Sequence, residues 1–241
     1  MRNGGQLLVE SLVALGATKA FGVPGESYLA VLDALHDTKG RLDFVTCRNE
    51  GGAAFMAAAW GKLTSTPGLC LVTRGPGVTN ASIGLHTAMQ DSVPMLLLVG
   101  QVGTDMKGRE AFQEIDYRAV FGSMAKWAVE IDRVDRLPEI LARAWTTAST
   151  GRPGPVVIAL PEDVLADRTD LPPLPGPARV FEAGAAPEAV EAALAARRSS
   201  PSPRRATSRS SRRSGSRTSS TTTRPSSPAR RGWECLPTSR A

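Results

Sequence analysis

Short apolar runs alternate along the first 165 residues with stretches whose leucines and alanines recur at helical spacing. The runs lack an alternation of apolar and polar residues, which indicates strands that are buried on both faces. Six strands are predicted in this way, at residues 19–23, 42–46, 69–73, 95–99, 127–131 and 155–160. Helices are predicted between them, at residues 4–15, 27–36, 50–63, 78–89 and 135–148.

This order of strands and helices predicts an α/β fold: a doubly wound parallel sheet of about six strands with helices on both faces. The crossover connections are expected to be right-handed. Ligands bind such sheets beyond the carboxyl ends of the strands. Functional residues are therefore expected in the loops at 22–27, 46–51, 73–80 and 100–116.

The domain organisation follows from changes in composition. We expect residues 1–168 to form one domain and residues 169–186, which contain the run LPPLPGP, to form an extended proline-rich linker. Residues 187–196 resemble the first helix of a central domain that the sequence does not continue. Residues 197–241 are dominated by Arg, Ser, Pro and Thr, a composition that predicts a disordered tail.

The net charge of +6 is unevenly distributed. Residues 195–241 hold 12 Arg and a single acid, for a net charge of +11, whereas the first 194 residues carry −5. An acidic body disfavours nucleic-acid binding, although the tail by itself is a candidate basic arm. Past Ala196 the chain contains no Val, Ile, Asp or Lys, as translation of a GC-rich gene out of frame would produce. Resequencing around codon 196 tests that hypothesis, and an intact frame rejects it.

The apolar runs, cysteines and histidines of the chain limit its cellular location and the metal sites it can form. No apolar run approaches the roughly 20 residues of a membrane span, and Glu10 interrupts what would be a signal peptide, so a cytoplasmic protein is expected. The three cysteines, at positions 47, 70 and 235, are predicted to be reduced and mostly buried. Two histidines, His36 and His86, are too few for a multi-histidine metal centre.

Two of the loops contain residues suited to a ligand site. The glycines and proline of residues 22–26 form a turn whose backbone can approach a ligand closely. Glu50 opens a helix rich in Gly and Ala. It either complements the helix dipole or is a carboxyl group in a largely apolar pocket that shares a proton with a ligand nitrogen.

The next loop, TRGPGVTN at residues 73–80, is expected to be a tight turn between a strand and a helix. Thr79 or Asn80 is expected to cap that helix. The loop matches neither the dinucleotide-binding nor the Walker phosphate-binding pattern, so a phosphate cradle is not predicted. The charged segment at 101–116 is mostly solvated or contacts a substrate.

Together these loops resemble the N-terminal, pyrimidine-binding domain of thiamine-diphosphate-dependent enzymes, most closely the acetolactate synthase-like group, over residues 3–165. The resemblance is carried by FGVPGE (21–26), RNEGGAAFMAAAWGK (48–62), TRGPGVTNASIGLHTAMQDSVPMLLLVG (73–100) and AFQEID (111–116). It implies a six-stranded parallel sheet and thiamine diphosphate as the cofactor. The implied reaction is carboligation or decarboxylation of a 2-oxo acid, with the choice between them and the substrate left open.

The resemblance also implies roles for individual residues. Glu50 corresponds to the glutamate that bonds the pyrimidine ring nitrogen and favours the imino tautomer, which then removes the proton from the thiazolium carbon. The remaining residues are Pro24 and Gly25, which line the pyrimidine pocket; Thr73, Pro76, Gly77 and Asn80, which shape the neighbouring turn; and Phe112 and Gln113, which lie toward the substrate. His86 is expected to be a packed structural residue.

The chain also departs from the family. The GDG…N motif, which holds Mg²⁺ and the diphosphate in the family's second sheet domain, does not occur in these 241 residues, so metal ligands are not expected here. The family's site forms between subunits, which implies a homodimer, a tetramer or a partner chain that carries the diphosphate-binding domain. The FAD of acetolactate synthases lies largely on the central domain, so an FAD requirement stays open. We therefore expect the chain to be inactive alone. A non-catalytic dimerisation or regulatory module is the alternative, and nucleic-acid binding through the tail is disfavoured.

Overall fold

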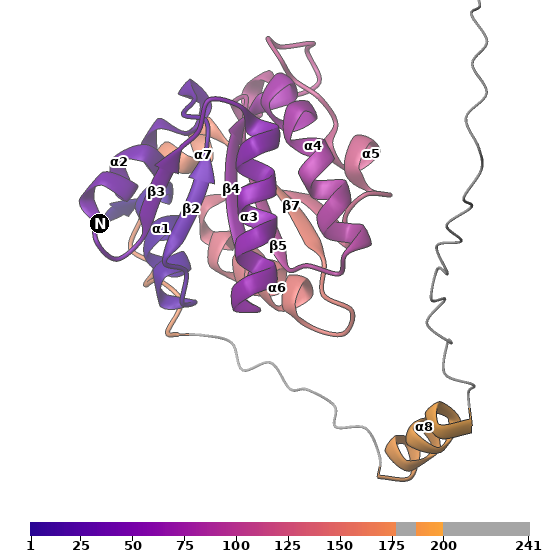
Figure 1. The fold of residues 1–241 in the computed structure, drawn as a ribbon. Helices are drawn as coiled ribbons and strands as arrows, with labels where there is room; N and C mark the ends of the chain where they lie inside the picture. Colours follow the sequence, from indigo (N-terminus) through magenta and orange to yellow (C-terminus); the bar gives the residue numbers. More distant parts are fainter. Residues whose placement is uncertain (177–186, 200–241) are drawn as a thin grey trace, which may run out of the picture. The chain divides into compact units, whose positions relative to one another are not determined.

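The computed structural model describes residues 1–176 and 187–199. Its centre is a six-stranded sheet in the order β3-β2-β4-β5-β7-β6, with every neighbouring pair parallel (Figure 1). The strands are β2 (Lys19–Gly22), β3 (Asp43–Thr46), β4 (Gly68–Thr73), β5 (Met95–Gln101), β6 (Trp127–Glu130) and β7 (Pro155–Pro161). The strands agree with those predicted from the apolar runs, and the predicted fold class is confirmed.

Helices cover both faces of the sheet, and each face has its own apolar core. One face is covered by α1 (Gly4–Ala14), α2 (Leu29–Asp37), α6 (Leu137–Ser149) and α7 (Glu162–Ala166). The other is covered by α3 (Glu50–Thr64), α4 (Arg74–Gln90) and α5 (Tyr117–Phe121). A short 3₁₀ turn, η1 (Glu26–Tyr28), leads from β2 into α2.

The small residues of α3 allow α4 to lie directly beside it (Figure 1). A Cβ atom added to Gly84 would lie 2.5 Å from the Cβ of Ala54, so a larger residue would force the two helices apart. Both helices begin at the carboxyl edge of the sheet. Their close packing therefore brings the first turns of α3 and α4 together at the edge where ligands are expected.

The start of α4 differs from the prediction. The helix begins at Arg74 rather than at residue 78, so the Gly-Pro-Gly sequence forms its first turn. Proline is tolerated there because first-turn N–H groups have no intrahelical acceptor. The expected capping roles of Thr79 and Asn80 are wrong, since Thr73 occupies the N-cap position. The Thr79 hydroxyl instead donates to the carbonyl of Gly75 at 2.9 Å.

A two-stranded ribbon that the sequence did not predict joins the ends of the described domain. In it, β1 (Arg2–Asn3) pairs antiparallel with β8 (Arg168–Thr169). Beyond β8, Leu171 and Leu174 pack against the core, and the Leu174 N–H donates to Ser11 Oγ at 3.3 Å. The apolar side chains of the proline-rich segment therefore dock onto the domain.

Helix α8 (Pro187–Ser199) covers the helix predicted at 187–196 and belongs to a separate unit. The disordered or out-of-frame tail was predicted from residue 197. Residues 197–199 instead form the end of α8, and the residues from position 200 onward lie outside the described part. Within the described ranges no helix has the length and apolar character needed to cross a membrane. The same residues contain no cluster of three or more His, Cys, Asp or Glu side chains arranged to hold a metal ion.

Candidate functional site

The carboxyl ends of β2 and β4 lie at the topological switch point of the sheet. These strands are neighbours, yet β2 leads to α2 on one face and β4 leads to α4 on the other. Open α/β sheets bind ligands in the crevice at such a switch point. The loop after β2 and the start of α4 are therefore the first places to look for a site.

Glu50 is the half-buried first residue of α3. The preceding residue caps the helix, because Asn49 Oδ1 accepts the N–H of Gly52 at 3.1 Å. The side-chain amide of Asn80, from α4, donates to Glu50 Oε2 at 3.0 Å. The second oxygen, Oε1, accepts no hydrogen bond from the described residues. The packing of α3 on α4 thus brings two predicted site residues together and leaves one carboxylate oxygen available.

The loop after β2 is held tightly against the end of β4. A Cβ atom on Gly25 would lie 2.5 Å from the Cβ of Thr73, so glycine is needed at this contact. The hydroxyl groups of Ser27 and Thr73 are 2.6 Å apart and form a hydrogen bond. The buried Tyr28 donates its phenol proton to the carbonyl of Val23. The turn that carries the exposed Pro24 is therefore fixed at both ends.

The first turn of α4 lies close to the end of β4. Pro76 is exposed, whereas Gly77 is buried, and a Cβ atom on Gly77 would lie 3.3 Å from the Cβ of Val72. The carbonyl of Gln113 accepts the N–H of Gly75 at 2.9 Å, which joins the segment after β5 to this turn. Phe112 is 70% exposed, so the structure brings only one of the two substrate-side residues against the start of α4.

A cavity of about 650 Å³ lies elsewhere, beside the ends of β5 and β6. Much of its lining comes from the predicted loop at 101–116, but neither Phe112 nor Gln113 lines it. Several of its charged groups already have partners. Lys107 pairs with Glu130 at 2.5 Å, and Glu114 accepts the N–H groups of Gly108 and Ala111. Glu110 and Arg118 also line the cavity, and their side chains have no ion pair or hydrogen bond with the described residues. The Glu50 region remains the better candidate site because it brings together the residues that the loop motifs single out.

Two buried acidic groups lie close enough to Glu50 to be affected by its charge. Burial raises the pKa of the Tyr28 phenol far above its ordinary value, and the charges of Cys70 and Glu50 add to that effect. Burial likewise raises the pKa of the Cys70 thiol, with additions from Cys47 and Glu50. Both groups stay protonated at neutral pH, so Tyr28 holds its loop as a hydrogen-bond donor.

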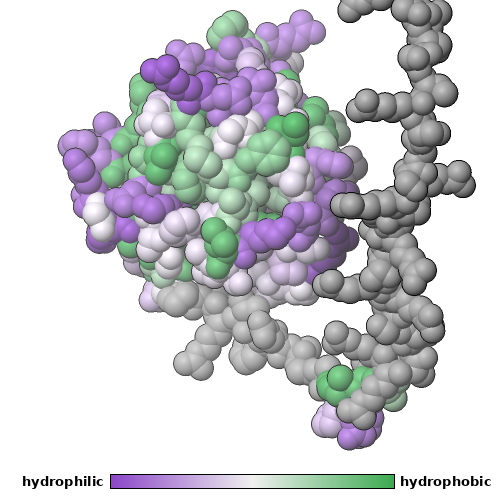
Figure 2. Space-filling view, viewed as in Figure 1, coloured by the Kyte–Doolittle hydropathy of each residue, from purple (hydrophilic) through white to green (hydrophobic). Residues whose placement is uncertain are grey.

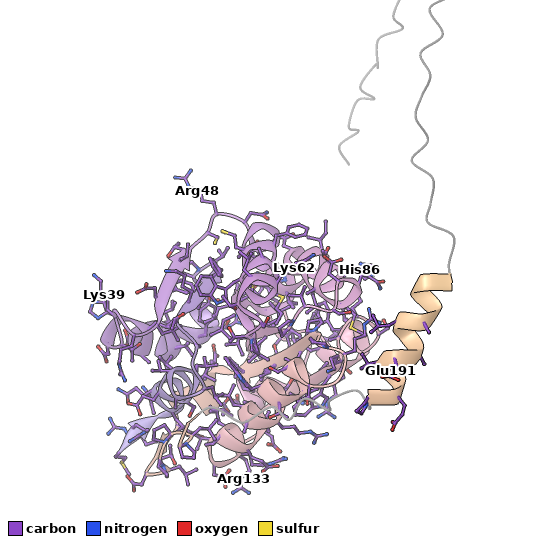
Figure 3. All side chains as sticks on the ribbon, turned by 60° about the horizontal axis from the view of Figure 1, so that its bottom comes forward. Lys39, Arg48, Lys62, His86, Arg133 and Glu191 are labelled. Carbon is purple, nitrogen blue, oxygen red and sulfur yellow. The ribbon has the colours of Figure 1, made fainter. Side chains whose placement is uncertain are left out.

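Arg74 is a further residue of this region, and its buried side chain pairs with Glu26 and Glu162. No local pattern marks it, because its partners lie 48 and 88 residues away. The prediction for His86 was also wrong, because this residue is exposed on α4 rather than packed (Figure 3). Of the cysteines, Cys70 is buried as predicted and Cys47 is half-buried, while Cys235 lies outside the described residues.

Comparison with known proteins identifies the domain. Residues 2–120 match the model of the thiamine pyrophosphate enzyme N-terminal TPP-binding domain. The matched residues belong to that family. Its match includes the elements of the Glu50 region, from β2 through the first turn of α4, so the resemblance noted from the loop motifs is confirmed.

Curated relatives of this thiamine pyrophosphate enzyme domain include acetolactate synthase subunits. The isozyme 3 large subunit of Escherichia coli K12 is 41% identical over 172 residues, which cover 71% of this chain and 30% of the relative. The probable large subunit of Methanocaldococcus jannaschii is 38% identical over 187 residues, or 78% of this chain and 31% of the relative. The mitochondrial catalytic subunit of Saccharomyces cerevisiae is 39% identical over 163 residues, or 68% and 24%. The chain thus spans less than a third of the length of these relatives.

Proposed function

We propose that residues 1–168 bind the aminopyrimidine ring of thiamine diphosphate, as one half of the cofactor site of an acetolactate synthase-like enzyme that acts on 2-oxo acids. The observation that carries this proposal is the Glu50 carboxylate, which lies at the carboxyl edge with one oxygen held by Asn80. The family match and the names of the relatives support the cofactor and the reaction class.

The donor set around Glu50 fits an aminopyrimidine. Because Asn80 occupies Oε2, the remaining oxygen, Oε1, is the acceptor for an N–H on the ring nitrogen. A hydrogen bond to an ionised carboxylate is stronger than one between neutral groups, so Glu50 holds a proton on that nitrogen. Thiamine diphosphate, when bound, supplies the electron sink for making or breaking a carbon–carbon bond beside a carbonyl group.

The other predicted residues position this acceptor and shape its surroundings. Pro24 and Gly25 form one wall of the pyrimidine pocket, and the contact of Gly25 with Thr73 sets its distance from β4. Pro76 and Gly77 form the adjoining first turn of α4. Gln113, fastened to that turn through its carbonyl, and the neighbouring Phe112 lie toward the substrate.

We further propose that a second subunit or a partner chain supplies the Mg²⁺ and diphosphate contacts. The GDG motif that makes them in the family is not found in these 241 residues. The outer surface of α3 and α4 supports subunit contact, because exposed apolar side chains gather there (Figure 2). They are Phe55, Met56 and Leu63 on α3 and Ile83 on α4. This face equally suits a non-catalytic module that dimerises with full-length relatives, which is the second candidate function.

Calorimetry tests the proposal of a shared site. We expect the 241-residue chain to bind thiamine diphosphate with Mg²⁺ only at millimolar concentration, and to bind it no more tightly than thiamine, which lacks the diphosphate. Micromolar affinity that depends on Mg²⁺ would show that this chain already holds the diphosphate and would refute the shared site. Turnover of a 2-oxo acid that appears only when a GDG-containing subunit is added would favour the enzyme over the regulatory module.

A further inference from the structure

We propose that Arg74 is a positioning residue for the aminopyrimidine site. Its guanidinium group connects the loop after β2, the start of α4 and the start of α7. This inference rests on the proposed function, since the positioned groups are those assigned to the pyrimidine pocket.

The side chain of Arg74 is only 10% exposed and reaches two acids on different elements. Its Nη1 donates to Glu26 Oε1 at 3.2 Å, and its Nη2 donates to Glu162 Oε2 at 3.1 Å. Glu26 directly follows Gly25, and Glu162 is the first residue of α7. The planar fork of arginine serves two separate acceptors at fixed angles, whereas the single ammonium of lysine does not.

The backbone at Arg74 also points to a constrained position. Its φ of 36° lies in the left-handed region, which is unfavourable for a residue with a Cβ atom. Gln113, whose carbonyl binds the next residue, has a φ of 66°. Such conformations persist only where the surrounding contacts enforce them, and they gather at functional sites. The ion pairs of Arg74 are contacts of this kind.

The guanidinium group is not completely satisfied. Its Nε is buried and finds no hydrogen-bond partner among the described residues. A buried donor without a partner lowers stability, and so does removing a charge from water. Glycine would suit the φ of this position better and would avoid both penalties. What arginine adds in return is the connection between the two acids, which fixes the loop that carries Pro24 and Gly25.

The test uses the 241-residue chain and 4-amino-5-(hydroxymethyl)-2-methylpyrimidine as the ligand. Affinity is measured by NMR titration, and loop mobility is measured by hydrogen–deuterium exchange with mass spectrometry. Arg74→Gln removes both ion pairs, and Arg74→Gly removes them while relieving the backbone. Arg74→Lys keeps the charge without the fork. The control is Arg133→Gln, because Arg133 lies at the surface and pairs locally with Asp135 (Figure 3).

We expect Arg74→Gln and Arg74→Gly to weaken ligand binding by about three- to tenfold and to speed exchange in residues 22–28 and 111–116. Exchange in β5 and β7 stays unchanged, Arg74→Lys restores part of the affinity, and Arg133→Gln behaves as wild type. Wild-type affinity and exchange in Arg74→Gln or Arg74→Gly would overturn the proposal. So would faster exchange spread uniformly over the sheet, which indicates a purely structural role.

Two further variants separate the possible failures. If Arg74→Gln does not fold, Glu162→Gln removes one ion pair from the surface side, and the same local rise in exchange and loss of affinity are expected. Unchanged values in Glu162→Gln would then overturn the proposal. Glu50→Gln tests the proposed function separately. If it leaves binding intact, the pyrimidine site is wrong; if it weakens binding while the Arg74 variants do not, only the role of Arg74 is wrong.

Discussion

Replacing Glu50 by Gln removes the negative charge from the candidate site while keeping the size of the side chain. The Gln amide oxygen can still accept the hydrogen bond from Asn80, which is 3.0 Å from Oε2 in the structure. The position of Oε1 then holds the NH₂ group, which donates hydrogen bonds and does not stabilise a proton on a ring nitrogen as a carboxylate does. The substitution should therefore act on ligand binding far more than on the fold.

The size of both effects follows from the surroundings. A hydrogen bond to a charged group contributes about 1.5–3 kcal/mol, so aminopyrimidine affinity should fall by about 10- to 100-fold. As a first-turn acid, Glu50 also interacts with the dipole of α3. Losing that interaction costs about 0.3–1 kcal/mol, which lowers Tm by roughly 1–4 °C in a domain of this size.

Glu139 provides a matched control, because it is an exposed acid in the first turn of α6. The Glu139 side chain makes no hydrogen bond to the described residues. Glu139→Gln should reproduce the small change in Tm without any change in affinity. NMR titration with the aminopyrimidine and thermal unfolding by calorimetry measure the two quantities. The reasoning is refuted if Glu50→Gln binds as wild type, or if Glu139→Gln weakens binding equally.

Three further predictions concern packing and titration. Gly25→Ala should lower the free energy of unfolding by about 1–3 kcal/mol, because the new Cβ atom would lie 2.5 Å from the Cβ of Thr73. Gly52→Ala should raise it by about 0.4–1 kcal/mol, because a Cβ atom there meets nothing within 4 Å. Equal midpoints of urea unfolding in the two variants would contradict this description of the packing. Cys70 should resist iodoacetamide at pH 8 in the folded chain and react in urea, as judged by peptide mass spectrometry, because burial raises its thiol pKa; rapid native labelling would count against this. Burial also raises the phenol pKa of Tyr28 and Tyr117, so their contribution to stability is present below pH about 10 and is lost above it, where unfolded phenols ionise first. An unfolding free energy that stays constant between pH 9 and pH 11 would contradict that prediction.

Much of the fold could be predicted because buried parallel strands leave continuous apolar runs, such as Met95–Val99. The errors arose where local chemistry has two outcomes. Gly-Pro-Gly suits both a turn and the first turn of a helix, and the position of α4 against α3 decides between them. The helix period at His86 could not show which face of α4 is covered, and the residue is exposed.

Less of the candidate site than of the fold could be predicted from the sequence. The spacing of Glu50 by itself favoured a dipole role over a ligand role, and only the family motifs favoured the ligand role. Glu50 and Asn80 are 30 residues apart in the sequence, and only the packing of α3 against α4 brings them into contact. Arg74 could not be found at all, because a buried arginine is recognised by distant partners that only the fold brings together.

The most direct test of the central claim is the location of the bound aminopyrimidine on the chain. A ¹⁵N–¹H spectrum of the 241-residue chain, titrated with the ligand to millimolar concentration, maps the residues it approaches. We predict that the shifts concentrate in residues 23–28, 48–52 and 73–80, around the Glu50 carboxylate. Shifts that concentrate instead around the cavity beside the ends of β5 and β6, or no shifts at all, would contradict the assignment of the pyrimidine site.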